Sequence, residues 1–270
     1  MSNISVAKES IKITSEGVYT IPSGGTVRLP KIDFTSVIVI SPEEGGKLLS
    51  EGIPGDTAGR KGVIKVINAD SYRAASQYNN PLVMNFANAH NPGGGFLMGA
   101  NAQEEALCRC STLYASITSD AAKEMYKYNN SHMSSVESDY MLISPDVVVF
   151  RNEFLELLPI PFQVGVVTIP APNRRGAAML TGKKKIAETF NRRIMIMLRA
   201  AEKYGYKDVV LGAWGCGAFG NDAEEVAGYF RTVLVDEGYG RMFDEICFAI
   251  YGREDGRNIT AFRKVLDGDK

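Results

Sequence analysis

The sequence predicts an α/β fold in which a mixed, largely parallel sheet is flanked by helices. From residue 62 onward, apolar runs typical of strands take turns with segments whose apolar residues recur at helical spacing. Such alternation is typical of parallel strands joined by crossover helices. No stretch is rich enough in Pro, Gly or Ser to act as a linker, and 45% of the 270 residues are hydrophobic. We therefore expect one domain over residues 1–270.

Residues 1–60 are expected to form a β-rich N-terminal extension that packs on this domain. Residues 17–30, GVYTIPSGGTVRLP, alternate between apolar and polar side chains and turn at Ser23-Gly24-Gly25. This pattern predicts a β-hairpin, and residues 35–41 predict a further strand. The hairpin either extends the main sheet as antiparallel strands or caps it.

The remaining elements follow in order along the chain. Strands are predicted at residues 62–68, 81–88, 139–144, 146–150, 163–172, 208–214 and 245–252. Helices are predicted at residues 102–118, 183–204, from about 221, and around 258–266. The clearest helix is 183–204, because it carries a single apolar stripe and Gly205 follows at the position of a helix stop. The stripe consists of Ile186, Phe190, Ile194, Met197, Ala201 and Tyr204.

Composition argues against several classes of protein. The chain has 30 basic and 31 acidic side chains, so its net charge of −1 gives no reason to expect binding to DNA or to a membrane surface. Its four cysteines and two histidines form no CxxC pair and no His cluster, so we expect neither a metal site nor a disulfide framework. The N-terminus lacks the layout of a signal peptide, and no apolar run approaches the ~18 residues of a membrane span. We therefore expect a cytoplasmic protein, and we take it to be a monomer.

Two glycine-rich loops each follow a predicted strand and precede a predicted helix. They are NPGGGFLMGANAQ (91–103) and GAWGCGAFGND (212–222). In open α/β sheets, ligands bind at the carboxyl ends of the strands, so both loops should rise from one edge. Glycine lets backbone N–H groups approach an anion, and two facing cradles could hold a diphosphate. The alternative is that both are tight turns without a ligand.

Two nucleotide-binding motifs are only partly matched. GCGAFG (215–220) fits G-x-G-x-x-G, but that motif belongs at the first strand of a dinucleotide fold, and only 50 residues follow Gly220. GAAMLTGKK (176–184) has one residue too many for a P-loop, and Lys184 stands where Ser or Thr should bind magnesium. We reject the P-loop, and the position of GCGAFG argues against the dinucleotide fold that competes with our interpretation.

Gln103, Glu104 and Glu105 are expected in the first turn of the helix that follows the first glycine loop. Acidic residues at this place favour the helix dipole by ~0.3–1 kcal/mol and need no further role. Neighbours on a helix point about 100° apart, so the two glutamates could not flank a scissile bond from opposite faces. One catalytic carboxyl with a second that holds substrate hydroxyls is more plausible. A pocket partly closed by Phe96, Leu97 or Phe219 would raise the pKa of such a carboxyl, as a general acid requires.

The run PGGGFLMGANAQEE (92–105) resembles the G-G-G-x(6–8)-Q-E-E signature of poly(ADP-ribose) glycohydrolases. The longer run from residue 85 to residue 116 is similar to the bacterial-type branch of that family, whose catalytic unit is a macrodomain. Further matches are SPDVVVFRN (144–152), IPAPN (169–173) and the second glycine loop. The resemblance covers roughly residue 60 to the end and implies a macrodomain-like fold with the N-terminal β extension of that branch.

The resemblance also implies an activity and the residues that carry it. The enzyme would be a glycosidase that cuts the ribose–ribose O-glycosidic bonds of poly(ADP-ribose) without a metal or other cofactor. Glu105 would be the general acid that protonates the leaving ribose oxygen and then activates water, while Glu104 and Asn88 would hold ribose hydroxyls. Phe219 would pack against that ribose, and Asp70 would contact the adenine. The remaining expected substrate contacts are Gly93, Gly94, Gly95, Gln103, Gly215, Cys216, Gly217 and Ala218.

Two alternatives stay open beside this function. A macrodomain can bind ADP-ribose without cleaving it, although paired glutamates near a diphosphate argue against a pure binding module. The enzyme could also hydrolyse a different ADP-ribosyl linkage, such as one to a protein side chain. The usual layout of the branch implies release of ADP-ribose from polymer ends. The expected partners are thus ADP-ribose and poly(ADP-ribose) on modified proteins.

Overall fold

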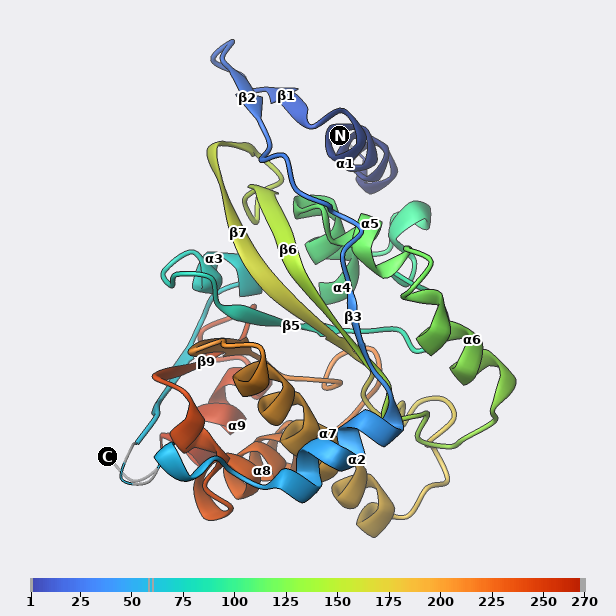
Figure 1. Ribbon diagram of the computed structural model, residues 1–270, viewed down its shortest axis with the longest axis vertical. Coiled ribbons are helices and arrows are strands. Elements are labelled where there is room, and N and C mark those ends of the chain that lie inside the picture. Colours follow the sequence, from blue (N-terminus) through green and yellow to red (C-terminus); the bar gives the residue numbers. More distant parts are fainter. Residues whose placement is uncertain (1, 58, 60, 268–270) are drawn as a thin grey trace.

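A seven-stranded mixed sheet forms the centre of the computed structural model, which describes residues 2–57, 59 and 61–267 (Figure 1). The strand order is β3-β6-β7-β5-β8-β9-β4. The pairs β3–β6 and β6–β7 are antiparallel, and the other four neighbouring pairs are parallel, so the expected fold class is confirmed. The strands of this sheet are β3 (Ile38–Ile40), β4 (Val63–Ile67), β5 (Leu82–Phe86), β6 (Met141–Arg151), β7 (Leu157–Ile169), β8 (Asp208–Leu211) and β9 (Glu245–Ala249).

Helices cover both faces of the sheet. On one face, α7, α8 and α9 pack over β5, β8 and β9, and α3, α4 and α5 lie on the other. The α-helices are α1 (Asn3–Glu16), α2 (Pro42–Glu51), α3 (Ser71–Ala75), α4 (Gln103–Cys110), α5 (Leu113–Ile117), α6 (Lys123–Ser131), α7 (Lys183–Lys203), α8 (Ala223–Arg231) and α9 (Arg257–Leu266). Shorter turns are η1 (Gly55–Thr57), η2 (Phe96–Met98), the π-helical η3 (Thr232–Asp236) and η4 (Tyr239–Met242). None of the described helices combines the length and the apolar character needed to cross a membrane.

Alternation along β5 decides which side chains reach which helix layer. Leu82 and Met84 belong to the core beneath α7 and α8, whereas Val83 belongs to the core beneath α3 and α4. Side chains two residues apart share one face of a strand, so Asn85 points to the same side as Val83. A buried amide is thereby placed under the N-terminal turn of α4, where the two glutamates lie.

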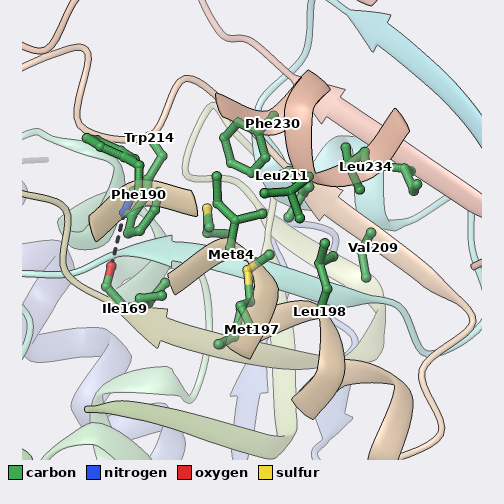
Figure 2. Close-up of a cluster of buried hydrophobic side chains, with 14 of the residues drawn as sticks. Met84, Ile169, Phe190, Met197, Leu198, Val209, Leu211, Trp214, Phe230 and Leu234 are labelled. Atoms are coloured by element: carbon green, nitrogen blue, oxygen red, sulfur yellow. Dashed lines mark hydrogen bonds between the residues drawn. The ribbon is translucent and has the colours of Figure 1, made fainter. Parts of the chain in front are cut away.

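Figure 2 shows the core beneath α7 and α8, in which Phe190 of α7 meets Trp214 edge-on with ring centroids 5.0 Å apart. Both side chains are fully buried. The indole of Trp214 donates a hydrogen bond to the backbone oxygen of Ile169 at 3.1 Å. This bond ties the start of the second glycine loop to the carboxyl end of β7. The α7 stripe from Ile186 to Ala201 and the stop at Gly205 (φ 84°) are confirmed, whereas Tyr204 lies just past the helix and is exposed.

The N-terminal 60 residues are not β-rich, which corrects our expectation. The 14-residue helix α1 begins after Ser2, whose side chain accepts from the N–H of Ser5, and ends at Gly17 with φ 65°. Its buried residues, Val6, Ala7, Ser10 and Ile13, follow helical spacing that is already visible in the sequence. The three strands of this stretch span only three residues each.

The predicted hairpin is present as β1 (Val18–Thr20) and β2 (Thr26–Arg28), an antiparallel pair in a sheet of its own. It therefore caps the main sheet rather than extending it, and packs against the outer end of β6 (Figure 1). Only β3 joins the main sheet, at its edge. That all of residues 1–270 form one domain stays a prediction.

Two further element boundaries differ from the expected ones. The helix expected over residues 102–118 is interrupted between α4 and α5, where Ser111 forms an isolated bridge with Val149. The two strands expected at 139–144 and 146–150 are a single strand, β6, with a register shift between Ser144 and Val147. Pro145 lies in that shift, because a residue without an N–H cannot continue a regular ladder.

Candidate active site

The two glycine loops leave the sheet side by side, as expected. They follow β5 and β8, which are parallel neighbours with Leu82 opposite Val209. The carboxyl ends of parallel strands lie at one edge, so residues 87–102 and 212–222 rise from that edge together. Helix α4 begins directly after the first loop and α8 directly after the second.

Glu105 is fixed against the first loop by both of its carboxylate oxygens. Oε2 accepts the N–H of Ala102 at 3.0 Å, and Oε1 accepts the N–H of Gly95 at 2.9 Å. The residue is 7% exposed. Each oxygen has a second lone pair, so the carboxyl can still meet one ligand atom while the backbone holds it in place.

Glu104 lies deeper and accepts three hydrogen bonds. Oε1 accepts from the N–H of Gly93 at 3.2 Å and from the amide of Asn85 at 3.3 Å, and Oε2 accepts from the N–H of Asn88 at 2.8 Å. Burial raises the pKa of Glu104 to about 8, the three donors oppose that rise, and the charge of Glu105 adds to it. Glu104 is thus largely protonated at neutral pH.

The three glycines of the first loop allow the glutamates to approach the backbone. Gly93 and Gly94 have φ values of 74° and 55°, and a Cβ on Gly94 would lie 2.5 Å from Oε1 of Glu105. A Cβ on Gly95 would lie 2.7 Å from that of Ala100. All three N–H groups already have partners inside the loop and the helix, since that of Gly94 donates to Asn91 at 3.0 Å. These glycines therefore do not form the free N–H cradle that we expected, and their contact with a diphosphate stays a prediction.

The second loop offers the free donors instead. Within the described part of the chain, the backbone N–H groups of Gly217, Ala218 and Phe219 have no hydrogen-bond partner. Gly215 (φ 74°) turns the loop, and a Cβ there would lie 2.6 Å from the amide nitrogen of Asn221. That amide donates to Pro172 at 2.9 Å and to the backbone oxygen of Gly215 at 3.1 Å, which fixes the loop. Successive free N–H groups are suited to binding an anion.

The side chains of the second loop are partly enclosed. Burial raises the pKa of the Cys216 thiol to about 12, so it is neutral and adds no charge beside an anion. Phe219 packs against the core beneath α7 and α8 while remaining partly exposed. By contrast, the buried Phe96 lies under the first loop against Tyr114, and Leu97 is half exposed. Of Phe96, Leu97 and Phe219, we therefore choose Phe219 as the side chain that could pack against a ligand.

Gln103 joins helix to strand, and its contact with the substrate stays a prediction. Its carbonyl oxygen accepts the N–H of Phe86 at 2.9 Å, and its amide donates to Met84 at 2.8 Å and to the hydroxyl of Ser71 at 3.1 Å. Every polar atom of this side chain thus has a partner in the protein. We assign it a positioning role between β5 and α4.

Asn88 and Asp70 both shape the backbone near their strands. The side-chain oxygen of Asn88 accepts the N–H groups of His90 and Asn91 at 2.9 and 3.0 Å, which begins the first loop. Asp70 caps α3 through Oδ1, which accepts from Tyr72 at 2.9 Å. Oδ2 of Asp70 is buried and has no partner among the described residues. Burial raises the pKa of Asp70, the backbone hydrogen bond from Arg73 opposes that rise, and the charge of Glu153 adds to it.

Sequence reasoning missed Asn85. Among the described residues, it is the only one whose side chain donates a hydrogen bond to Glu104 or Glu105. Its amide also donates to the hydroxyl of Thr168 at 3.1 Å. A polar residue inside the apolar strand LVMNF was the available signal. Across the described residues, no three His, Cys, Asp or Glu side chains are arranged to hold a metal ion.

Comparison with known proteins identifies the family. Residues 7–152 match the family model described as "Microbial-type PARG, catalytic domain". The poly(ADP-ribose) glycohydrolase of Thermomonospora curvata has a crystal structure that matches with a TM-score of 0.90 at 35% identity, covering 98% of this chain and 99% of that chain. The structure of that enzyme bound to the inhibitor ADP-HPD has a TM-score of 0.86 at 35% identity and covers 97% and 98% of the two chains.

The enzyme of Deinococcus radiodurans in complex with ADP-ribose has a TM-score of 0.81 at 34% identity and covers 90% of this chain and 99% of that chain. No curated protein sequence matched. The family model spans more than half of the chain, and the similar structures span nearly all of it. The chain belongs to the microbial-type poly(ADP-ribose) glycohydrolase family, with its macrodomain-like fold.

Proposed function

We infer that this protein is a poly(ADP-ribose) glycohydrolase, a glycosidase that cuts ribose–ribose O-glycosidic bonds and releases ADP-ribose. One observation carries this most directly. Two buried glutamates are held against a glycine loop, and the neighbouring loop presents free backbone N–H groups. Carboxyls suit a sugar, and free N–H groups suit the diphosphate joined to it. Solved relatives that hold ADP-ribose or ADP-HPD support this function.

Glu105 is the residue to which we assign the chemistry. Its proton passes to the leaving ribose oxygen as the glycosidic bond breaks, and the sugar becomes oxocarbenium-like. Water then attacks the anomeric carbon and gives its proton to Glu105, which restores the acid. Adjacent residues on one helix cannot flank the bond, so one carboxyl serves both steps.

Glu104 supports this chemistry without taking part in proton transfer. With a pKa raised to about 8, it is largely uncharged at neutral pH and repels neither Glu105 nor the diphosphate. A protonated carboxyl both donates and accepts a hydrogen bond, so it can hold a ribose hydroxyl. We assign the same task to the side-chain amide of Asn88, and to Phe219 the packing against that ribose.

The diphosphate is proposed to lie on the second loop, on the free N–H groups of Gly217, Ala218 and Phe219. Its negative charge then stands near the developing positive charge of the sugar. Contacts with Gly93, Gly94 and Gly95 from the facing loop complete this expected binding site.

The adenine is proposed to lie near Asp70, whose Oδ2 has no partner within the described residues. Asp70 follows β4, which is separated from β5 by β8 and β9. Neighbouring strands are about 4.8 Å apart, so roughly 14 Å separates the two strand ends. An extended ligand with a sugar at one end and a base at the other fits this span.

Release from polymer ends, a cytoplasmic location and a monomeric state stay predictions. End-directed release follows if the protein covers the adenine end of the bound unit. An early appearance of long oligomers among the products would contradict it.

The proposed function is tested with two substrates measured in parallel. One is auto-modified poly(ADP-ribose), and the other is a protein that carries single ADP-ribosyl groups on its side chains. We expect ADP-ribose from the polymer, with the last protein-linked unit left in place. Equal release from the singly modified protein would identify a different linkage, and binding of ADP-ribose without any release would identify a binding module.

A further inference from the structure

A cavity of about 490 Å³ lies beside the second glycine loop. Neither of the two glutamates nor any residue of the first loop lines it. Its walls come from the segment before α7 and the first residue of α7, from the second loop including Cys216, and from the N-terminal ends of α8 and α9. These helices cover the face of the sheet opposite α4. The charged residues of the lining are Arg174, Arg175, Lys183, Asp222, Glu225 and Arg257.

Positive charge is in excess in this cavity. Four cationic side chains face two carboxylates, which leaves two positive charges unbalanced. Glu225 is paired with Arg174 and with Lys183, each at 2.8 Å, and Asp222 is paired with Arg257. Both acids are therefore neutralised. A cavity of this composition favours an anion.

Arg175 is the cation that remains free for a ligand. Its guanidinium forms no ion pair with any acid in residues 2–57, 59 and 61–267, and the residue is exposed. A Cβ on Gly220 would lie 2.8 Å from its Nε, so the arginine rests directly on the second loop. Gly217, with its free N–H, is three residues away, a chain distance of at most about 10 Å. The diphosphate cradle and the cationic cavity thus share one loop.

We propose that this cavity binds the diphosphate of a second ADP-ribose unit, the neighbour in the polymer of the unit that is being released. The inference rests on the proposed function. Each unit of the polymer carries a diphosphate. The free N–H groups of the second loop can bind only one of these diphosphates, so the diphosphate of the neighbouring unit needs another site. A guanidinium forms two parallel hydrogen bonds to phosphate oxygens, which makes Arg175 the natural anchor. The cavity then gives polymer an advantage over free ADP-ribose.

The variant Arg175→Gln tests this, with Arg28→Gln as its matched control. Arg28 is an exposed arginine of β2, in the hairpin far from α8 and α9 (Figure 1). In the background of Glu105→Gln, which leaves the oligomer uncut, binding of an end-labelled ADP-ribose oligomer is measured by fluorescence anisotropy, and binding of ADP-ribose by calorimetry. We expect Arg175→Gln to weaken oligomer binding roughly tenfold, as loss of a charge-assisted bond does, and to leave ADP-ribose affinity within about twofold.

Kinetics and salt dependence provide the further measurements. Arg175→Gln should raise the KM for polymer and leave kcat unchanged, and the slope of log affinity against log salt should fall by roughly one. Arg175→Glu should weaken oligomer binding further, and Arg28→Gln should match the wild type.

Three results would overturn the inference. One is oligomer affinity in Arg175→Gln equal to that of the wild type. Another is an equal loss for Arg28→Gln, since the effect would then be one of overall charge. The third is a loss of ADP-ribose affinity in Arg175→Gln as large as its loss of oligomer affinity, because Arg175 would then belong to the site of the released unit. Failure of the proposed function is visible separately, as absent cleavage by the wild type while the binding measurements remain interpretable.

Discussion

Gly94→Ala is expected to inactivate the enzyme while leaving it folded. Gly94 has φ 55°, and its missing Cβ faces the carboxylate of Glu105. In the left-handed region, a side chain costs about 1–2 kcal/mol. A Cβ would lie 2.5 Å from Oε1 of Glu105, where ordinary contact begins at 3.4 Å, so the carboxylate must retreat by about 0.9 Å. Misplacement of a catalytic group by ~1 Å can cost about a hundredfold in rate.

Gly17→Ala separates the two effects of this change. Gly17 has φ 65°, and no atom of the described residues lies within 4 Å of its Cβ position, so it carries the same backbone strain without a contact at the site. Gly17→Ala should lose about 1–2 kcal/mol in urea unfolding, and Gly94→Ala should lose more, because the displaced carboxylate also weakens its bonds to Gly95 and Ala102. Only Gly94→Ala should lower kcat for ADP-ribose release, by about a hundredfold. A Gly94→Ala enzyme with the kcat of Gly17→Ala would refute the assignment of the loop as a support for Glu105.

Three further outcomes are expected. Glu104 has a folded-state pKa of about 8 against an ordinary 4.5, so its stabilising contribution is complete below pH 4.5 and is lost as the pH rises through 8. Glu104→Gln should flatten this decline in the urea midpoints measured from pH 5 to 9. Parallel curves for the variant and the wild type would contradict this prediction. Gln103→Leu leaves the N–H of Phe86 and the backbone oxygen of Met84 unpaired, so it should cost about 2–4 kcal/mol of stability with unchanged ADP-ribose affinity. Lost affinity at full stability would indicate a direct substrate contact. Trp214→Phe removes the 3.1 Å hydrogen bond to Ile169 and should lower the free energy of unfolding by about 1–3 kcal/mol, measured by thermal unfolding. An unchanged Tm would contradict this prediction.

Most of the sheet and its helices could be predicted because their signals are local. The α7 stripe repeats at helical spacing and ends at Gly205, and the buried strand β5 is a run of apolar residues bounded by loops. Helices α1 and α2 carry signals of the same kind. Ser41 and Glu44 form a capping box at the start of α2, and spacing marks the buried face of α1. These two were missed because the strand patterns of the hairpin dominated the interpretation of the first 60 residues.

The layout of the site could be predicted only in part. That both glycine loops share an edge follows from the rule for parallel sheets. That the N–H groups of Gly93 and Gly95 point at the glutamates does not follow, because it depends on how α4 folds back over the loop. The same tertiary contact places Gln103 between strand and helix. Spacing in a sequence cannot distinguish an N–H group that binds a ligand from one that holds a carboxylate.

The most direct test of the central claim compares Glu105→Gln with Glu44→Gln. Glu44 occupies the same helical position in α2, where its carboxylate accepts the N–H of Ser41 at 2.9 Å on an exposed surface. ADP-ribose release from auto-modified polymer and ADP-ribose affinity are measured for both variants and for the wild type. We predict that Glu105→Gln loses release by roughly 10²–10⁴-fold and keeps its affinity, while Glu44→Gln retains both. Release by Glu105→Gln at the wild-type rate would contradict the assignment of Glu105 as the acid.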